Sequence, residues 1–403
     1  MPRLSHTVTG VPQSGIREIM NLAAGRQGVV RLEVGEPLFA TPPHIVEAAV
    51  QALRDGFTRY TPNAGLPSVR EAICARMERD YGVKIGPERV CVTVGGVGGI
   101  SSALRAAVDA GDEVLIPDPG WPNYYMMAVV AGAVPRRYPL RPQNGYLPDL
   151  DELRSMVGPR TRVLLVNSPS NPLGTVFPPA LVEALVEFAY AHDLILISDE
   201  VYDRIVYEGT HRTACAYDPD GRVVSVFSAS KTYAMTGWRV GYAIAGEDMV
   251  RQMAKLQEAY VSCAPAPAQK ALEAALTGPQ DCVDAMCRTY RENRDLTCQL
   301  LAERGIVHRR PQGAFYVWIR VGCRDSTEFA RRLLAEYGVA LAPGSTFGPS
   351  GEGYVRVSLV SPADAIREGV ARLADAIARA AEDGTGAAGR GAHAADRPGG
   401  CEA

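Results

Sequence analysis

The sequence lacks any apolar run that approaches the roughly 20 residues needed by a membrane-spanning helix. It also lacks an excess of charge of one sign, because 42 Lys and Arg stand against 45 Asp and Glu, a net charge of −3. No basic field therefore points to nucleic acid or an anionic membrane as a partner. The first 15 residues lack the apolar core of a signal peptide. These features predict a cytoplasmic protein with no membrane or nucleic-acid partner.

Metal and disulfide signatures are also missing. The chain has nine cysteines, an odd number, with no Cys-x-x-Cys pair, and its six histidines are scattered without metal-ligand spacing. A disulfide scaffold and a zinc site are both poorly supported by this pattern. Reduced thiols in a cytoplasmic enzyme without a metal are the simpler interpretation.

The composition is that of a globular protein with a large core: 403 residues, 47% of them hydrophobic and 22% charged. Strand-like and helix-like segments alternate from Val90 to Ala245, which predicts an α/β fold with a mostly parallel central sheet flanked by helices. From about Glu258 longer helical segments follow, and strands expected at residues 313–319 and 354–359 indicate a smaller α/β domain.

Lys231 is the residue around which the chain is organised. An apolar strand at residues 223–227 ends in Ser228-Ala229-Ser230, and Lys231 follows before a second strand at residues 240–245. Burial between strands disfavours the charged form of an amine, so Lys231 is a candidate Schiff-base nucleophile. The alternative is a solvated charge, which is what most lysines at strand ends are.

Three further patterns carry chemistry, each with a plainer alternative. Gly95 to Gly99 follow a strand at residues 90–94 and open a helix, so their N–H groups suit a phosphate, although a simple turn would look similar. Asp199 ends a strand at residues 194–197, where an acid is ordinarily solvated or caps a helix. Arg356 lies in the apolar strand 354–359, where it suits a carboxylate ligand unless it is a surface residue.

The run Ser-x-Ser-Lys…Met-Thr-Gly-Trp-Arg-x-Gly-Tyr, from Ser228 to Tyr242, closely resembles the cofactor-lysine segment of class I and II aminotransferases. These are fold-type I enzymes that depend on pyridoxal 5′-phosphate (PLP), and the resemblance extends from about Val29 to Ala381. It implies a fold-type I architecture and a homodimer with composite active sites. The expected divisions are an N-terminal arm with part of the small domain (1–45), a large PLP-binding domain (46–284), a small domain (285–382) and a disordered tail (383–403).

The resemblance also implies a role for each matching residue. Lys231 would carry PLP as an internal aldimine and, once freed, move the Cα proton of an L-amino acid, so that a 2-oxo acid leaves and a second oxo acid accepts the amino group. Asp199 would face the pyridine nitrogen, and Tyr202 would contact the ring oxygen. The other implied cofactor ligands are Gly95, Gly96, Val97, Trp121, Asn171, Ser228 and Arg239. Tyr60 would reach the cofactor phosphate bound by the partner subunit. The implied substrate-binding residues are Gly35, Trp121, Asn171 and Arg356.

Two departures from the family pattern keep other reactions open. Leu38 replaces an acid in the Gly-Glu-Pro-x-Phe segment, and the turn Gly95 to Gly99 holds more glycines than the family pattern, which predicts a wider space beside the cofactor. A PLP-dependent lyase or synthase, acting by elimination, replacement or cyclisation, would use the same first steps. A non-enzymatic ligand-binding domain of a transcription regulator is disfavoured, because no DNA-binding helix pair precedes the domain. We favour the aminotransferase, because no residue is identifiable as a leaving-group activator.

Overall fold

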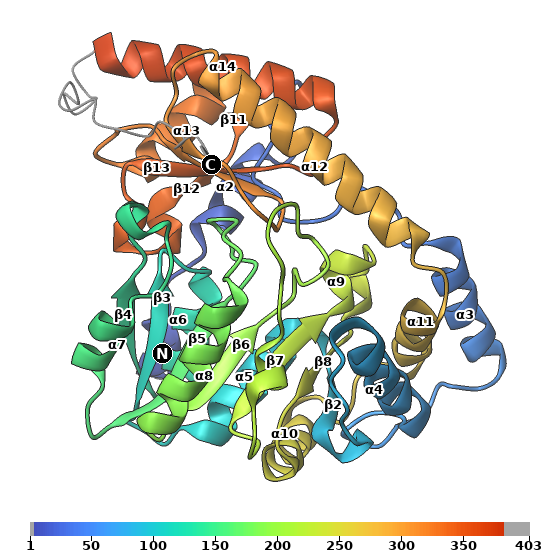
Figure 1. The fold of residues 1–403 in the computed structure, drawn as a ribbon. Coiled ribbons are helices and arrows are strands. Elements are labelled where there is room, and N and C mark those ends of the chain that lie inside the picture. Colours follow the sequence, from blue (N-terminus) through green and yellow to red (C-terminus); the bar gives the residue numbers. More distant parts are fainter. Residues whose placement is uncertain (1–3, 383–403) are drawn as a thin grey trace, which may run out of the picture.

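The computed structural model describes residues 4–382 (Figure 1). Its larger part is built on a seven-stranded sheet in the order β2-β8-β7-β6-β5-β3-β4. Only β8 is antiparallel to its neighbours, so the expectation of a mostly parallel sheet is confirmed. The strands are β2 (Val90–Thr93), β3 (Glu113–Asp118), β4 (Val134–Pro139), β5 (Thr161–Asn167), β6 (Ile195–Asp199), β7 (Val223–Ser228) and β8 (Gly241–Ile244).

Alternating side chains of each central strand enter two different helical layers, as the two-residue period of a strand requires. Val163 and Leu165 of β5 pack in one cluster with α5 (Gly95–Ala107), α6 (Pro122–Val130) and α10 (Glu247–Tyr260). Leu164 and Val166 pack in another with α7 (Leu150–Met156) and α8 (Pro179–Ala191). At the β2–β8 end, a third cluster joins the sheet to α3 (Pro43–Arg54), α4 (Pro67–Tyr81) and α11 (Ala266–Thr277).

The sequence did not predict β4. We expected a loop between the helix near residue 133 and the strand at residue 162, because Pro135, Arg136, Arg137 and Pro139 interrupt any apolar pattern. The structure corrects this: β4 is the edge strand and pairs only with β3 among the described strands. An edge strand tolerates proline and charge because one side of its backbone has no neighbouring strand.

The smaller part lies above the large sheet in Figure 1 and carries an antiparallel sheet, β12-β13-β10-β9. Its strands are β9 (His308–Arg309), β10 (Tyr316–Arg320), β12 (Ala342–Pro343) and β13 (Tyr354–Ser358). The helices beside it are α12 (Asp281–Ala302), α13 (Ser326–Tyr337) and α14 (Ala363–Glu382). β10 begins at Tyr316 rather than at Gly313 as predicted.

Both ends of the described chain contribute to the smaller part. β1 (Val30–Arg31) pairs in parallel with β11 (Val339–Ala340). α12 runs between the two parts, since Val283 packs in the cluster of α3, α4 and α11 while Met286 packs with the smaller sheet. The domain limits 45/46 and 284/285 remain predictions. The expected disordered tail, 383–403, lies outside the described residues.

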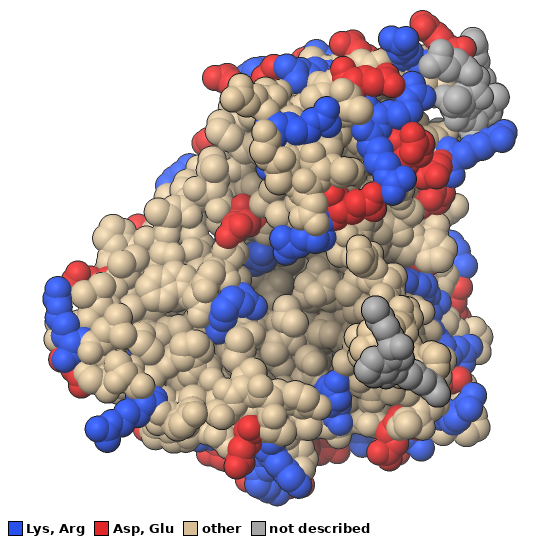
Figure 2. All heavy atoms as spheres, turned by 180° about the vertical axis from the view of Figure 1, so that it is seen from behind, with Lys and Arg blue, Asp and Glu red and all other residues tan. Residues whose placement is uncertain are grey.

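Charges of both signs are interspersed over the face in Figure 2, and no field of one sign covers it. Within residues 4–382, no helix is both long enough and apolar enough to cross a membrane. Before β1, the chain forms the short α1 (His6–Thr9) and then α2 (Gly15–Ala23).

Candidate active site

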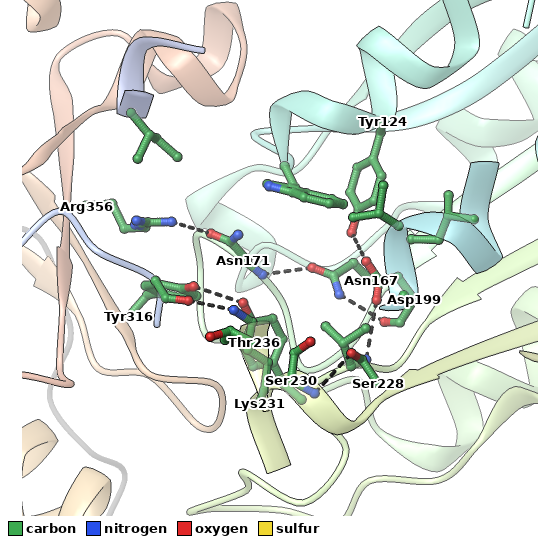
Figure 3. A pocket seen from close by; sticks show the side chains of 18 of the residues that line it. Tyr124, Asn167, Asn171, Asp199, Ser228, Ser230, Lys231, Thr236, Tyr316 and Arg356 are labelled. Carbon is green, nitrogen blue, oxygen red and sulfur yellow. Dashed lines mark hydrogen bonds between the residues drawn. The ribbon is translucent and has the colours of Figure 1, made fainter. Parts of the chain in front are cut away.

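A pocket of about 250 Å³ lies at the carboxyl edge of the large sheet, where the smaller part meets it (Figure 3). This edge is where ligands bind to open α/β sheets, because the strand ends and helix starts converge there. Strands β5, β6 and β7 end in Asn167, Asp199 and Ser228, and all three residues line the pocket. From the smaller sheet, β10 and β13 contribute Tyr316 and Arg356.

Lys231 lies on α9 (Ala229–Thr232), a single helical turn that directly follows β7. Its Nζ donates a hydrogen bond of 2.6 Å to the carbonyl oxygen of Gly35. Burial lowers the pKa of the Lys231 amine to about 8; Glu36 opposes this shift, and Arg356 adds to it. The predicted effect of burial on this amine is therefore present, and a substantial neutral fraction exists near pH 7–8.

Asp199 is 3% exposed at the end of β6. Its Oδ2 accepts a 2.6 Å hydrogen bond from the hydroxyl of Tyr124, and its Oδ1 accepts one of 3.3 Å from the Val201 N–H. Burial raises the pKa of the Asp199 carboxyl to about 6, although the Tyr124 hydroxyl works against that shift. A buried carboxylate with so few donors suits a cationic partner such as a protonated ring nitrogen.

Arg356 is 2% exposed, so it is not the surface residue that an isolated strand arginine usually is. Its Nη1 donates to Oδ1 of Asn171 at 3.0 Å and its Nη2 to the carbonyl oxygen of Glu33 at 2.6 Å. The guanidinium also lies over the ring of Tyr316, 4.1 Å from the centroid. Nε has no hydrogen-bond partner among the described residues. An unsatisfied buried guanidinium nitrogen is a ready donor to an anion.

The Gly95 turn and Arg239 meet at the start of α5. Gly95 has φ +69°, a backbone conformation that favours glycine, and a Cβ there would lie 2.5 Å from Nη2 of Arg239, so the turn and this side chain lie close together. Nη1 of Arg239 donates to the Thr236 carbonyl oxygen at 2.8 Å. The first N–H groups of a helix have no intrahelical acceptors, so this cationic corner suits a phosphate.

Gly99, one of the additional glycines, does not open space in the pocket. A Cβ on Gly99 would lie 2.9 Å from Cγ1 of Val226, so β7 fills the space and glycine allows α5 to approach the sheet. Leu38, the other departure, is 61% exposed and does not line the pocket.

Most of the predicted site residues converge on this pocket. Its lining includes Gly35, Gly96, Val97, Trp121, Asn171, Asp199, Tyr202, Ser228, Lys231, Arg239 and Arg356. Gly95 lies behind Arg239 and is not itself part of the lining. Tyr60 is 87% exposed and lies outside the pocket of its own chain. Glu200, to which no role was given, is buried and contacts His211 and the Ala214 N–H.

Sequence reasoning missed several lining residues. The ring of Trp121 meets that of Tyr124 edge-on at 5.4 Å, and the Tyr202 and Tyr316 hydroxyls are 2.9 Å apart. The missed residues are Ile16, Ile100, Tyr124, Asn167, Val201, Ser230, Thr236 and Tyr316. Asn167 and Ser230 could have been found by extending the strand-end argument, whereas Tyr316 depends on how the smaller sheet packs against the larger one.

These groups together fit PLP. An N-terminal helical turn with Arg239 and Ser228 suits its phosphate, the buried Asp199 carboxyl suits its ring nitrogen, and the Lys231 amine suits its aldehyde. The unsatisfied Nε of Arg356 suits the carboxylate of a substrate. A donor set with one amine, one carboxylate and two separated guanidinium groups matches a phosphorylated aldehyde together with an amino acid.

Comparison with known proteins agrees with this geometry. A family model described as "Aminotransferase class I and II" matches residues 27–373. The chain is 39% identical over 359 residues to a probable aspartate/prephenate aminotransferase of Thermus aquaticus, covering 87% of this chain and 93% of the relative. It is 36% identical over 378 residues to aromatic-amino-acid aminotransferase 2 of Thermococcus litoralis, covering 92% and 97%.

Among solved structures, the aspartate aminotransferase from Thermus thermophilus with maleate superimposes with a TM-score of 0.89. That chain is 38% identical, and the match covers 93% of this chain and all of the other. The relatives are named as aminotransferases, which supports amino-group transfer and not the lyase or synthase alternative. The chain belongs to the class I and II aminotransferase family, as a fold-type I enzyme that transfers amino groups.

Proposed function

We propose that this enzyme uses PLP to move an amino group between an L-amino acid and a 2-oxo acid. The observation that carries the proposal is the Lys231 amine, whose pKa is lowered to about 8 in a pocket that also holds Asp199 and Arg356. The names of the relatives, which include aspartate/prephenate and aromatic-amino-acid aminotransferases, support amino acid and 2-oxo acid substrates.

Each residue that would hold the cofactor suits a different part of PLP. Asp199 would bind the ring nitrogen, Tyr202 and Asn171 the ring oxygen, and Trp121 the ring face. A covalent link to Lys231 would fix the aldehyde carbon. When bound, PLP supplies an electron-withdrawing ring that stabilises the charge left at Cα after loss of a proton. The phosphate ligands would be Ser228, Arg239 and the backbone of Gly95, Gly96 and Val97.

Substrate orientation would depend on Arg356 and Asn171. Their 3.0 Å hydrogen bond and the aromatic surface of Tyr316 hold the guanidinium in place before a ligand arrives. A bidentate contact would fix both the position and the orientation of the α-carboxylate. The Cα–H bond of the amino acid would then have a defined direction relative to Lys231. The Gly35 segment closes this side of the pocket.

Lys231 would carry the proton. An amine with a pKa near 8 is neutral often enough to accept the Cα proton at neutral pH and acidic enough, once protonated, to return it. The Gly35 carbonyl oxygen, 2.6 Å from Nζ, holds the amine at the pocket wall.

We also propose a homodimer that works in the cytoplasm. The side chain of Tyr60 is 87% exposed in the single chain, which leaves it accessible to a partner subunit. In this arrangement Tyr60 would reach the phosphate in the partner's site. The eight described cysteines are all free thiols, in keeping with a reducing compartment.

The test is a half-reaction followed by absorbance. An amino donor added alone to the holoenzyme should change the cofactor spectrum and release one 2-oxo acid per site, and a second 2-oxo acid should restore the spectrum. Release of ammonia, or loss of a side-chain group without a lasting spectral change, would contradict amino-group transfer.

A further inference from the structure

The cationic side chains of the pocket already have partners in the proposed chemistry. Within residues 4–382, the cationic residues that line the pocket are Lys231, Arg239 and Arg356. Their proposed partners are the cofactor aldehyde, its phosphate and the substrate α-carboxylate. No cation in the described lining is left over for a second carboxylate of an amino acid such as aspartate.

The rest of the wall offers apolar surface. Five apolar residues line the pocket, and Val97, which is 37% exposed, presents the first turn of α5 to a ligand. Asp199, the acidic residue of the described lining, is engaged by Tyr124. The apolar lining residues are Ile16, Val97, Ile100, Trp121 and Val201.

The boundary between the pocket and the neighbouring surface is also apolar. Ile16 of α2 and Trp121 line both the pocket and an outer groove of about 820 Å³ between α2 and α6. Arg17 lines the outer groove and not the pocket, and its side chain is exposed. Glu18 in the same groove is paired with Arg331. Arg17 is therefore the nearby cation to test for binding of a second carboxylate.

We infer that this enzyme prefers amino acids with apolar or aromatic side chains to dicarboxylic amino acids. The inference rests on the proposed function and names the substrate class of the same site. A second carboxylate would lose its hydration against Ile16, Val97 and Trp121 without gaining a cationic partner. An aliphatic or aromatic side chain in the same place removes apolar surface from water on both sides.

Leucine and aspartate provide a matched test, because their side chains have nearly the same shape and differ mainly in charge. The half-reaction of the holoenzyme should have a second-order rate constant about 100-fold higher for leucine than for aspartate, with phenylalanine also ahead of aspartate. A leucine-to-aspartate ratio below about 10 would overturn the inference. That result would also follow if the partner subunit supplied a cation to the site.

Binding measurements separate this inference from the proposed function. 4-Methylpentanoate and succinate form the same matched pair without an amino group, and calorimetry on the holoenzyme should show at least about tenfold tighter binding of 4-methylpentanoate. Tighter binding of succinate would overturn the preference. If no amino acid changed the cofactor spectrum while 4-methylpentanoate still bound more tightly, amino-group transfer would fail and the preference would stand.

Arg17→Gln serves as the control variant, because Arg17 is outside the pocket lining and has no role in the proposed machinery. The leucine-to-aspartate ratio should stay within about twofold of that of the unchanged enzyme. A selective loss of aspartate reaction of more than about tenfold would show that Arg17 binds a second carboxylate, and would overturn the inference.

Discussion

The hydroxyl of Tyr124 donates a 2.6 Å hydrogen bond to Oδ2 of Asp199, and both side chains are buried. Tyr124 comes from α6 and Asp199 from the end of β6, so the bond fixes the carboxyl between two elements of the large part (Figure 3). It is also the strongest hydrogen bond acting against the rise in the pKa of Asp199 that burial causes. Tyr124 is therefore a positioning residue for the group that would bind the cofactor nitrogen.

Tyr124→Phe should weaken PLP binding about tenfold or more, since a hydrogen bond to a charged acceptor contributes about 1.5–3 kcal/mol. The pKa of Asp199 should rise further, so affinity should begin to fall at a higher pH on acidification than in the unchanged protein. Equilibrium titration of the apo-protein with PLP across pH measures both effects. Tyr138→Phe is the matched control, because its hydroxyl donates to the Leu165 carbonyl oxygen and not to the site.

Asp199→Asn should stabilise the apo-protein above pH 6. Burial raises the pKa of Asp199 from 3.8 to about 6, so the folded state favours its neutral form. The stability gained from protonation is complete below pH 4 and is lost as pH rises through 6. An amide mimics the neutral form, so the free energy of unfolding at pH 8 should increase by about 1–3 kcal/mol, and the difference should vanish near pH 4. Denaturant titration at both pH values checks this; an increase that persisted at pH 4 would contradict the assignment.

Lys231 should be the lysine that borohydride fixes to PLP, and peptide mapping of the reduced holoenzyme would identify it. Lys231→Ala should abolish this adduct while retaining cofactor that dialysis removes, held by Arg239, Ser228 and Asp199. An adduct on any other lysine would refute the assignment of Lys231.

Glu36 faces the same amine and raises its pKa, while burial and Arg356 lower it. Glu36→Gln should therefore move the pKa of Lys231 below 8, because one opposing charge is removed. The pH dependence of reductive methylation of Lys231 in the apo-protein, resolved by mass spectrometry, would report the shift. An unchanged or higher pKa would show that Glu36 does not act on this amine.

The sequence predicted the position of a site residue only when that position follows from local strand patterns and not from packing between distant segments. Asp199 and Ser228 end adjacent parallel strands, so strand patterns alone bring them to one edge. The contact between Arg356 and Asn171 joins residues 185 positions apart and needs the packing of two sheets. The family motifs assigned both residues to one site, but nothing in the sequence predicted the hydrogen bond between them. The sequence did not predict strand β4, because its prolines and arginines interrupt the alternation of apolar and polar residues that is typical of a strand.

The hydrogen bond between Tyr124 and Asp199 was not predicted for the same reason. Its residue type and its place after Trp121 gave no sign of a partner, since a tyrosine at the start of a helix ordinarily packs in the core. The hydrogen bond to Asp199 arises because α6 lies against the carboxyl edge of the sheet, 75 residues before Asp199 in the chain. No local pattern encodes that distance.

Arg356→Ala should weaken the half-reaction of every α-amino acid to a similar extent, because the α-carboxylate is common to all of them. We expect a loss of at least about 100-fold in the second-order rate constant, corresponding to about 3 kcal/mol for a buried charge-assisted contact. The leucine-to-aspartate ratio should change little. A loss confined to dicarboxylic donors would show that Arg356 binds the side-chain carboxylate instead.

Subunit mixing tests the proposed role of Tyr60, which is 87% exposed in the single chain. If Tyr60 serves the partner's site, a hybrid of Lys231→Ala and Tyr60→Phe subunits contains one site with both changes and one with neither. Mixing the two inactive or weakened homodimers under conditions that exchange subunits should then restore activity, up to about one quarter of the unchanged enzyme when hybrids form half of the dimers. If Tyr60 instead acted within its own subunit, each hybrid site would carry one change and mixing would restore nothing. Sedimentation of the unchanged enzyme as an active monomer would also contradict the composite site.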